Sequence, residues 1–286
     1  MDEGGLGMEK RFKGKVLYNP SGKAKEYNKW AINMFNGCRH DCSYCFCKKG
    51  VLGAVLGGIT PIIKKSVGSF DNAVMTAIKE VEAHKEQIIA DGGVLFSFST
   101  DPCQEGMVWT STSLVAKALL ERNVPVTILT KAASFVRTMG FSELLKVANG
   151  NLLVGFTLTG HDELEPHAAP NALRIDAMRY IHNAGIKTFA SIEPIVDFDA
   201  SLSMIRESRD CCDLFKVGLM SGVKEGYYSN DKLVAFCENV MKVDGGFKVY
   251  WKDSIRKRLQ KVSPQTLENI DKWEYSVSAD YNIFAE

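Results

Sequence analysis

Four cysteines lie within a stretch of ten residues: Cys38, Cys42, Cys45 and Cys47. The first three form a C-x3-C-x2-C pattern. In an electron-transfer 4Fe–4S cluster each iron normally carries one protein thiolate, so three thiolates leave one iron open to another ligand. The amino and carboxylate groups of S-adenosylmethionine suit that open iron as a chelating pair. The spacing therefore predicts a 4Fe–4S cluster on Cys38, Cys42 and Cys45, with one iron left for a chelating ligand of this kind.

Cys47 leaves two other interpretations open. Four thiolates can hold a structural zinc ion in tetrahedral geometry, which would make the chain a zinc-binding interaction module on Cys38, Cys42, Cys45 and Cys47. The same four could instead ligate an iron–sulfur cluster that only transfers electrons. Because a single residue separates Cys45 from Cys47, the favoured interpretation is that Cys47 lies near the cluster without ligating it.

The bulk composition is that of an ordinary globular protein. Of the 286 residues, 45% are hydrophobic and 24% are charged, as in soluble globular domains, and the length suits a single α/β barrel. No stretch reaches about 18 consecutive apolar residues, so a membrane span is not expected. The N-terminus lacks the basic and apolar parts of a secretory signal, which predicts a cytoplasmic location. In such a chain, clustered thiols indicate metal ligation more than disulfides.

The overall charge is balanced, with 35 basic and 34 acidic side chains. It gives no general attraction to nucleic acid or anionic membranes, and it says nothing about local patches. Near the C-terminus Tyr250 and Trp251 precede a basic run of Lys252, Arg256, Lys257, Arg258 and Lys261. Basic side chains interleaved with aromatics can bind a nucleic-acid backbone and stack bases. A solvated helix face is the favoured interpretation of the run, since acidic residues stand nearby.

Short apolar runs typical of strands alternate with helix-period segments along the chain. The predicted strands are 31–35, 94–98, 124–130, 152–159, 187–192, 213–219 and 247–251. Helical spacing follows Ser69 or Asp71, follows Asn171, and spans about 229–243. Strands that alternate with helices pair in parallel with right-handed crossovers, which gives either a wound sheet or a barrel.

The strand ends favour the barrel. In Phe96-Ser97-Phe98-Ser99 both serines face one side, and Phe156-Thr157-Leu158-Thr159 repeats the pattern; residues 189–193 and 215–219 do the same. A doubly wound sheet would tend to be apolar on both faces. One polar face predicts an open barrel that holds a polar ligand at the C-terminal ends of its strands. Residues 1–14, rich in glycine and charge, are predicted to be a mobile tail. Residues 15–286 would form one domain with a short C-terminal helical extension.

The cysteine pattern after a first strand, with Tyr44 just before the last cysteine, resembles the radical S-adenosylmethionine superfamily. Residues 36–46 look like the G-C-x-H-x-C-x-Y-C-Y signature of its spore photoproduct lyase-like branch. Residues 96–104 are similar to that branch's S-x-x-T-D-P-Y-Q segment. Ile128-Leu129-Thr130-Lys131 resembles its TK strand end, and 154–157 its next ligand-facing strand.

This resemblance implies a partial (β/α)6 TIM-like barrel of the radical SAM type. It also implies that S-adenosylmethionine is cleaved reductively at the cluster to give a 5′-deoxyadenosyl radical, which abstracts hydrogen from a substrate. Tyr44 would lie against the adenine, and Ser99, Thr100, Lys131 and Thr157 would contact the cosubstrate. The inward phase of Ser99 and Thr157 agrees with this independently. A reductant protein, flavodoxin or ferredoxin, is implied as electron donor.

Three further features have interpretations that rest on the residues alone: a carboxylate at a strand end, a histidine in the cysteine loop and an acidic segment. Glu193 ends an inward-facing strand phase, so its carboxylate would bond a ribose hydroxyl or the methionyl ammonium, or else cap the turn before Pro194. His40, inside the cysteine loop, is predicted to donate a hydrogen bond to the cluster sulfurs. The segment 161–167, with two histidines and three acidic residues, is predicted to be a solvent-facing acidic loop rather than a metal site.

The substrate is not named by these motifs. Phe98 stands where spore photoproduct lyase carries a hydrogen-donating cysteine, and Cys103 lies where many relatives have tyrosine, which argues against thymine-dimer repair. The branch contains many proteins of unassigned substrate. Nucleic acid is the preferred class, from the branch resemblance and the basic C-terminal run, and a peptide or a small molecule stays open.

Overall fold

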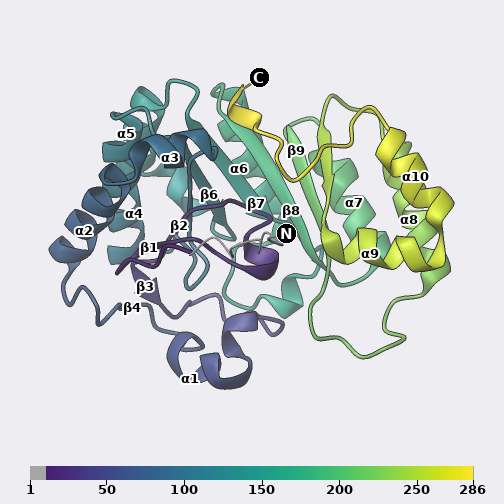
Figure 1. The fold of residues 1–286 in the computed structure, drawn as a ribbon, viewed down its shortest axis with the longest axis horizontal. Helices are drawn as coiled ribbons and strands as arrows, with labels where there is room; N and C mark the ends of the chain where they lie inside the picture. Colours follow the sequence, from purple (N-terminus) through teal and green to yellow (C-terminus); the bar gives the residue numbers. More distant parts are fainter. Residues whose placement is uncertain (1–10, 286) are drawn as a thin grey trace, which may run out of the picture.

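The computed structural model describes residues 11–285. Its main sheet has eight strands in the order β1-β2-β5-β6-β7-β8-β9-β10, with β1 antiparallel to β2 and all later neighbours parallel (Figure 1). Within the described residues the sheet stays open between β1 and β10, which confirms the predicted partial barrel. The strands are β1 (Leu17–Tyr18), β2 (Ala31–Ile32), β5 (Val94–Phe96), β6 (Val126–Thr130), β7 (Leu152–Thr157), β8 (Lys187–Ile195), β9 (Leu214–Leu219) and β10 (Lys248–Trp251).

The first predicted strand, 31–35, is divided in the structure. Its start is β2, whereas its end belongs to β3 (Phe35–Asn36), which pairs antiparallel with β4 (Ile62–Ile63) in a separate small sheet. Asn33 lies at the division, and its side-chain oxygen accepts hydrogen bonds from the amides of Phe98 and Ser99. These bonds also end β5 two residues before its predicted end, because the two amides no longer face a neighbouring strand.

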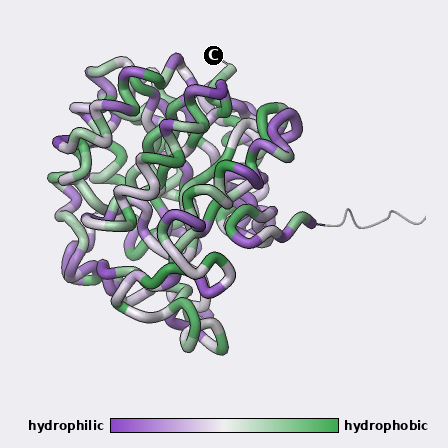
Figure 2. The backbone as a smooth tube through the Cα atoms, turned by 90° about the vertical axis from the view of Figure 1, so that its left-hand side faces the viewer, coloured by the Kyte–Doolittle hydropathy of each residue, from purple (hydrophilic) through white to green (hydrophobic). Residues whose placement is uncertain are grey.

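Helices follow the strands and cover the outside of the sheet (Figure 1). Ser69 caps the first long one, α2, by accepting a hydrogen bond from the amide of Asn72, as predicted. Figure 2 shows hydrophobic and hydrophilic residues alternating along the surface helices, which is the pattern of helices packed on one side. The helices are α1 (Gly53–Leu56), α2 (Phe70–Glu82), α3 (Lys85–Ala90), α4 (Met107–Leu120), α5 (Met139–Val147), α6 (Asn171–Asn183), α7 (Phe198–Ser208), α8 (Asn230–Met241), α9 (Asp253–Val262) and α10 (Pro264–Lys272).

A second, smaller apolar cluster joins strands β7 to β10 to the C-terminal segment. Leu153, Phe189, Leu214, Tyr250 and Ile283 are buried together in it, and neighbouring C-terminal side chains pack on them. Lys187, the first residue of β8, donates to the carbonyl of Ile283 at 2.7 Å. The C-terminal segment therefore lies at the N-terminal ends of the strands, and the opposite ends are left for a site.

The predicted N-terminal tail lies mostly outside the described residues. Its last part, residues 11–14, belongs to a hairpin: the amide of Gly14 donates to the carbonyl of Leu17 at 2.8 Å. The ring of Phe12 packs on Trp30 and His84. At the other end, α9 and α10 follow β10 where a helical extension was predicted. Among residues 11–285, no helix combines the length and the apolar character needed to cross a membrane.

Candidate functional site

A cavity of about 510 Å³ lies at the C-terminal ends of the parallel strands. One side is the loop that carries the clustered cysteines, and the other is formed by the ends of β5 to β9 and by residues 21–27. The structure brings all nine residues of the predicted cluster and cosubstrate sites to this cavity: Cys38, Cys42, Cys45, Tyr44, Ser99, Thr100, Lys131, Thr157 and Glu193.

The cysteine loop begins at a glycine that no other residue can replace without strain. Gly37 has φ +86°, and a Cβ there would lie 2.5 Å from the carbonyl oxygen of Thr60. The next amide, of Cys38, donates to the carbonyl of Gly58 at 2.8 Å. These contacts turn the chain sharply out of β3, and the following thiols consequently face the cavity.

The thiols match the donor chemistry of an iron–sulfur cluster. All four are free, and a hydrogen bond from the Cys47 thiol lowers the pKa of Cys45 to about 6 against the opposing effect of burial. Burial raises the pKa of Cys38 to about 12. In the part of the chain that the structure describes, no three His, Cys, Asp or Glu side chains are gathered to hold one metal ion. A cubane does not need such a gathering, because each of its thiolates binds a different iron.

The segment after β7 is clamped onto the cysteine loop. The amide of Ser43 donates to the carbonyl of Leu164 at 2.9 Å, and His40 and His167 exchange two further contacts. The hydroxyl of Tyr44 donates to Glu165, whose carboxylate is entirely buried. The ring of Tyr44 is thereby fixed in the cavity wall.

Glu165 corrects the prediction of a solvent-facing acidic loop. Its Oε2 lies 2.6 Å from the guanidinium of Arg174, and neither side chain is exposed. Arg174 also donates to the carbonyl of Thr157 at the end of β7. Only part of the segment behaves as predicted: His161 pairs with Glu163 at the surface. A carboxylate can be buried here because a guanidinium and a phenol satisfy both its oxygens.

Asp101 forms a second buried polar centre beside the cysteine loop. Its carboxylate accepts hydrogen bonds from Thr130 Oγ1, from the amide of Lys131, both at 2.7 Å, and from the amide of Cys103 at 2.9 Å. His40 Nε2 lies 3.0 Å away. Burial would raise the pKa of Asp101, but His40 and these donors hold it at about 2. Burial alone would lower the pKa of His40, and Asp101 outweighs that effect and raises it.

The predicted hydrogen bond from the His40 side chain to the sulfurs is therefore wrong, although the backbone of His40 does hydrogen-bond to Cys38. Its Nε2 faces Asp101 and its Nδ1 faces the carbonyl of His167. The side chains that do reach a sulfur include Gln104, whose Nε2 lies 3.6 Å from the sulfur of Cys38. Gln104 also donates to Thr100 Oγ1 and accepts from the amide of Arg39. The sequence singled it out only as the last residue of a family-like segment.

The side chains at the ends of β5 and β6 that are predicted to contact the cosubstrate differ in whether their polar groups already have protein partners. Ser99 donates its hydroxyl to the carbonyl of Phe35, and the hydroxyl of Thr100 already accepts from Gln104. The amine of Lys131 lies 5.6 Å above the Tyr44 ring and forms no ion pair among the described residues. Burial would lower the pKa of Lys131, but Cys42 and Glu165 raise it. A charged amine that lacks a carboxylate at the cavity wall is suited to an anionic ligand group.

Glu193, on β8, lies at the opposite wall with partners that the sequence did not reveal. Its carboxylate is paired with Lys252 and with Lys23, the latter at 3.1 Å, and accepts from the hydroxyl of Tyr27 at 3.0 Å. Tyr27 also contacts Ser191 Oγ at 2.6 Å. Burial would raise the pKa of Glu193, whereas Lys252 and Lys23 lower it. The carboxylate thus holds this wall together, and its oxygens face protein donors.

Residues 22–28, which we name the strap, connect this wall to the N-terminal part of the chain. Lys216 on β9 donates to the carbonyls of Glu26 and Tyr27, and Tyr250 on β10 donates to the Glu26 carboxylate. Burial and the charge of Lys252 lower the pKa of Lys216 to about 7. The strap therefore spans the open side of the barrel by polar contacts to β8, β9 and β10.

The basic C-terminal run does not form a nucleic-acid surface, which was the less favoured of its two interpretations. Lys252 is fully buried against Glu193, Arg256 pairs with Asp271 at 2.7 Å, and Lys257 pairs with Asp253 at 2.6 Å. The aromatic rings before the run, Tyr250 and Trp251, are buried and have no face for a base to stack on. Ion pairing along α9 and packing of β10 account for both differences.

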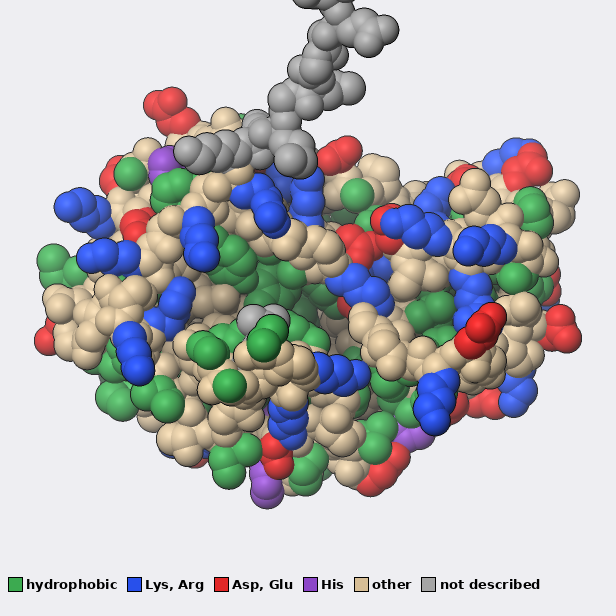
Figure 3. Space-filling view, turned by 60° about the horizontal axis from the view of Figure 1, so that its bottom comes forward, with side chains coloured by type: hydrophobic (Ala, Val, Ile, Leu, Met, Phe, Trp, Pro, Cys, Tyr) green, Lys and Arg blue, Asp and Glu red, His purple; other side chains and the backbone are tan. Residues whose placement is uncertain are grey.

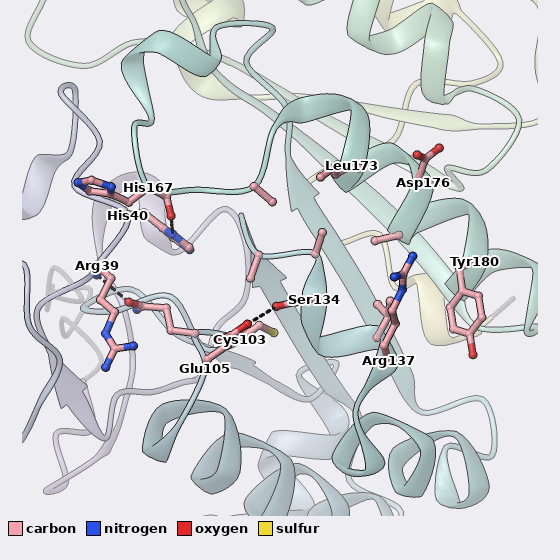
Figure 4. A pocket seen from close by; sticks show the side chains of 16 residues that line it. Arg39, His40, Cys103, Glu105, Ser134, Arg137, His167, Leu173, Asp176 and Tyr180 are labelled. Atoms are coloured by element: carbon pink, nitrogen blue, oxygen red, sulfur yellow. Dashed lines mark hydrogen bonds between the residues drawn. The ribbon is translucent and has the colours of Figure 1, made fainter.

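A second cavity of about 630 Å³ lies on the other side of the cysteine loop. Figure 4 shows Arg39 and Arg137 on opposite sides of it, with Glu105 and its hydrogen bond to Ser134 between them. His40 lines both cavities. Among its lining residues, however, are none of the predicted cluster or cosubstrate residues. The smaller cavity therefore carries the candidate chemistry.

Comparison with known proteins gives one sequence relative of unknown role. No family model matches the chain. An uncharacterized protein of Methanocaldococcus jannaschii is 24% identical over 176 residues, a match that covers 59% of this chain and 61% of that protein. The match spans less than two thirds of the relative's length, and it carries no function with it.

Two solved structures share the fold. Spore photoproduct lyase complexed with a dinucleoside spore photoproduct matches with a TM-score of 0.55 and 15% identity, over 92% of this chain and 78% of that one. SuiB of Streptococcus suis bound to S-adenosylmethionine matches with a TM-score of 0.53 and 15% identity, over 85% and 55%. Both are radical SAM enzymes, and this chain has their partial-barrel fold.

Proposed function

We propose, from this shared fold and from the cavity, that the chain is a radical SAM enzyme with a 4Fe–4S cluster on Cys38, Cys42 and Cys45. One observation carries the proposal. Nine residues chosen from the sequence, spread from position 38 to position 193, line a single cavity at the strand ends. That is where the ligands of α/β barrels bind.

The bound cluster and cosubstrate would supply the radical chemistry: one electron passed to the sulfonium gives methionine and a 5′-deoxyadenosyl radical. The chain's own residues bind, orient and shield. Tyr44, fixed by Glu165, offers a ring face for the adenine. The amine of Lys131 would pair with the methionyl carboxylate, because no protein carboxylate is paired with it in the described chain. Thr157 and Ser99 add polar groups to the wall.

Cys47 is assigned a place beside the cluster rather than on it. Its thiol hydrogen-bonds to Cys45 and lies 3.5 Å from the carbonyl of Phe98. If Cys47 were the fourth ligand, the protein would be an electron carrier and would not cleave S-adenosylmethionine. If all four thiols held zinc, the protein would be an interaction module.

Two partners belong to the proposal. A one-electron donor protein, flavodoxin or ferredoxin, would reduce the cluster. The substrate class we propose is nucleic acid. One structural neighbour was solved with a dinucleoside lesion, and SuiB was also solved with its precursor peptide SuiA, so the fold itself does not decide between these classes. The charge distribution of this chain favours the first, as argued below.

The experiment is anaerobic reconstitution with iron and sulfide, reduction with dithionite, and assay of 5′-deoxyadenosine. The wild type is expected to be brown and to release deoxyadenosine, and Cys38→Ala, Cys42→Ala and Cys45→Ala are each expected to lose both properties. Cys237→Ala, a buried thiol on α8 far from the loop, is the matched control and should keep them. A colourless protein with one zinc per chain, or a cysteine variant of the loop with full turnover, would overturn the proposal.

A further inference from the structure

The near-neutral net charge conceals a strong separation along the chain. Residues 11–65 carry eleven Lys and Arg side chains against two Asp and Glu, whereas residues 66–286 carry 23 against 29. The basic segment contains β1 to β4, the strap and the cysteine loop. Because strap and loop both line the cavity, the positive charge is concentrated on the part of the molecule that forms the cavity mouth.

The basic side chains at the mouth differ in how free they are to meet a ligand, because Lys23 is paired with Glu193 and Lys48 with Asp41. Lys23, Lys48 and Lys49 line the cavity, and Lys25 follows on the strap. Lys25 and Lys49 are exposed and form no ion pair among the described residues, although Lys49 lies 3.5 Å from the carbonyl of Ser221. Figure 3 shows Lys and Arg side chains standing around a hollow with a hydrophobic interior. Like charges around a cleft focus a positive field on its opening.

An exposed apolar segment borders the same mouth. From Phe46 to the first residue of β4, five large hydrophobic side chains are half exposed or more: Phe46 53%, Val51 93%, Val55 64%, Ile59 60% and Ile62 66%. We name residues 46–62 the lip. Single exposed hydrophobics are ordinary, but this many in one short segment mark a surface that a partner covers. Phe46 also lines the cavity, so the lip continues into the site.

We propose that the strap lysines, Lys48, Lys49 and the lip form a docking surface for a single-stranded or locally unpaired nucleic acid. The lysines would bind phosphates and the lip would cover unstacked bases, which are the two components of single-strand binding. The cavity, about 510 Å³ in volume, is too small for a duplex and is shared with the proposed cluster and cosubstrate, so the reacting nucleotide must leave its stack to reach it. This inference rests on the proposed function for the reaction, though not for the binding.

The lining of the cavity favours nucleic acid over a membrane. Basic residues beside an apolar segment also suit an anionic bilayer. Beyond the lip, however, the cavity is lined by the hydroxyl side chains of Ser21, Ser191 and Ser221, in addition to the groups assigned to the cosubstrate. These groups suit the hydrogen-bonding edges of a base or sugar and not an acyl chain. The mouth thus combines a polyanion site outside with a polar pocket inside.

The test is the affinity of the full chain for a labelled single-stranded oligonucleotide, measured by fluorescence anisotropy with and without the cluster. The mouth variant Lys25→Glu/Lys49→Glu is expected to bind roughly tenfold or more weakly. Its slope of log K against log salt should fall by about 1.4, since each single-strand phosphate contact contributes about 0.7. The matched control is Lys242→Glu/Lys261→Glu, which reverses two exposed lysines at the far ends of α8 and α9; it should bind within about twofold of wild type.

A second variant separates the lip from the charge. Val51→Ser/Val55→Ser keeps the net charge and should weaken binding several-fold with an unchanged salt slope, because it removes only apolar contact. Circular dichroism checks that each variant is folded. Equal losses of oligonucleotide affinity in the mouth and control variants would overturn the proposed docking surface. Binding of phosphatidylserine vesicles or polyglutamate in preference to the oligonucleotide would also overturn it.

The outcomes distinguish this inference from the proposed function. If the mouth variant loses binding but no preparation forms deoxyadenosine, the surface stands and the radical SAM assignment fails. If deoxyadenosine forms and the oligonucleotide does not bind the wild type, the surface fails alone.

Discussion

The two walls of the cavity are held together in different ways. On the cysteine side, Asp101 and Glu165 are buried, and each gathers several donors around one carboxylate. On the strap side, lysines converge on Glu193, and one of them, Lys23, keeps 37% of its side chain exposed. In the cysteine-side wall, protein donors satisfy the buried carboxylates without water. The strap-side wall is an ion-pair network close to solvent. The difference suggests a rigid wall for the cofactor and a more adjustable one for the substrate.

The largest expected effect comes from breaking the rigid wall at its ion pair. Glu165→Gln leaves Arg174 buried without a counter-charge, and removal of one partner from a buried pair typically costs about 3–5 kcal/mol. Urea unfolding of the cluster-free protein measures the loss. Glu163→Gln, an exposed carboxylate on the same segment, is the control and should cost at most about 1 kcal/mol. Equal losses in the two variants would contradict a structural role for the buried pair.

A somewhat smaller effect is expected from Asp101, and it depends on pH. Its pKa is held at about 2 in the folded chain, below its ordinary value of 3.8, so the unfolded chain binds the proton first. The carboxylate therefore contributes stability above about pH 4, and this contribution is lost as the pH falls toward 2. A shift of this size corresponds to about 2 kcal/mol. Urea unfolding at several pH values should show the dependence in wild type and a weaker one in Asp101→Asn.

The smallest effect is expected at the strap-side wall and has the opposite origin. Lys216 has its pKa lowered to about 7 from 10.5, so the folded chain carries a penalty for its charge below pH 7. That penalty fades between about pH 7 and 10, because the folded chain releases the proton first and stability rises with pH. We expect roughly 1 kcal/mol, since the side chain is partly exposed.

Lys216→Met is the variant that tests this effect. It should remove the rise in the urea midpoint between pH 7 and pH 10 relative to wild type. If Lys216→Met keeps the wild-type pH dependence of the urea midpoint, the strap-side wall is no more adjustable than the cysteine side.

The same contrast explains what the sequence could predict. The cysteine loop and the serine and threonine strand ends are local patterns, and they predicted the cavity and most of its lining. Glu193 meets Lys252 and Lys23 from 59 and 170 residues away, and no local pattern signals such pairs. Asn33 divides a strand because its side chain takes the place of strand-to-strand backbone hydrogen bonds. The spacing of apolar residues gives no sign of such a replacement.

The errors about charge have a similar cause. Glu165 was placed among surface acids because its partner, Arg174, lies on the next helix. The sequence already places acids beside the C-terminal basic run, but helical spacing does not show which of its basic side chains Asp271 and Asp253 pair with. Composition balanced the charges over the whole chain, whereas their segregation into residues 11–65 gains meaning only once the fold puts the strap and the cysteine loop at one mouth.

The proposed radical SAM chemistry depends most directly on how many protein thiolates the cluster has. Electron paramagnetic resonance of the reconstituted, dithionite-reduced chain, recorded with and without S-adenosylmethionine, measures this. We expect a 4Fe–4S signal that changes on addition of S-adenosylmethionine, in wild type and in Cys47→Ala alike. A signal that S-adenosylmethionine leaves unchanged, together with loss of the cluster in Cys47→Ala, would contradict a cluster held by only three protein thiolates.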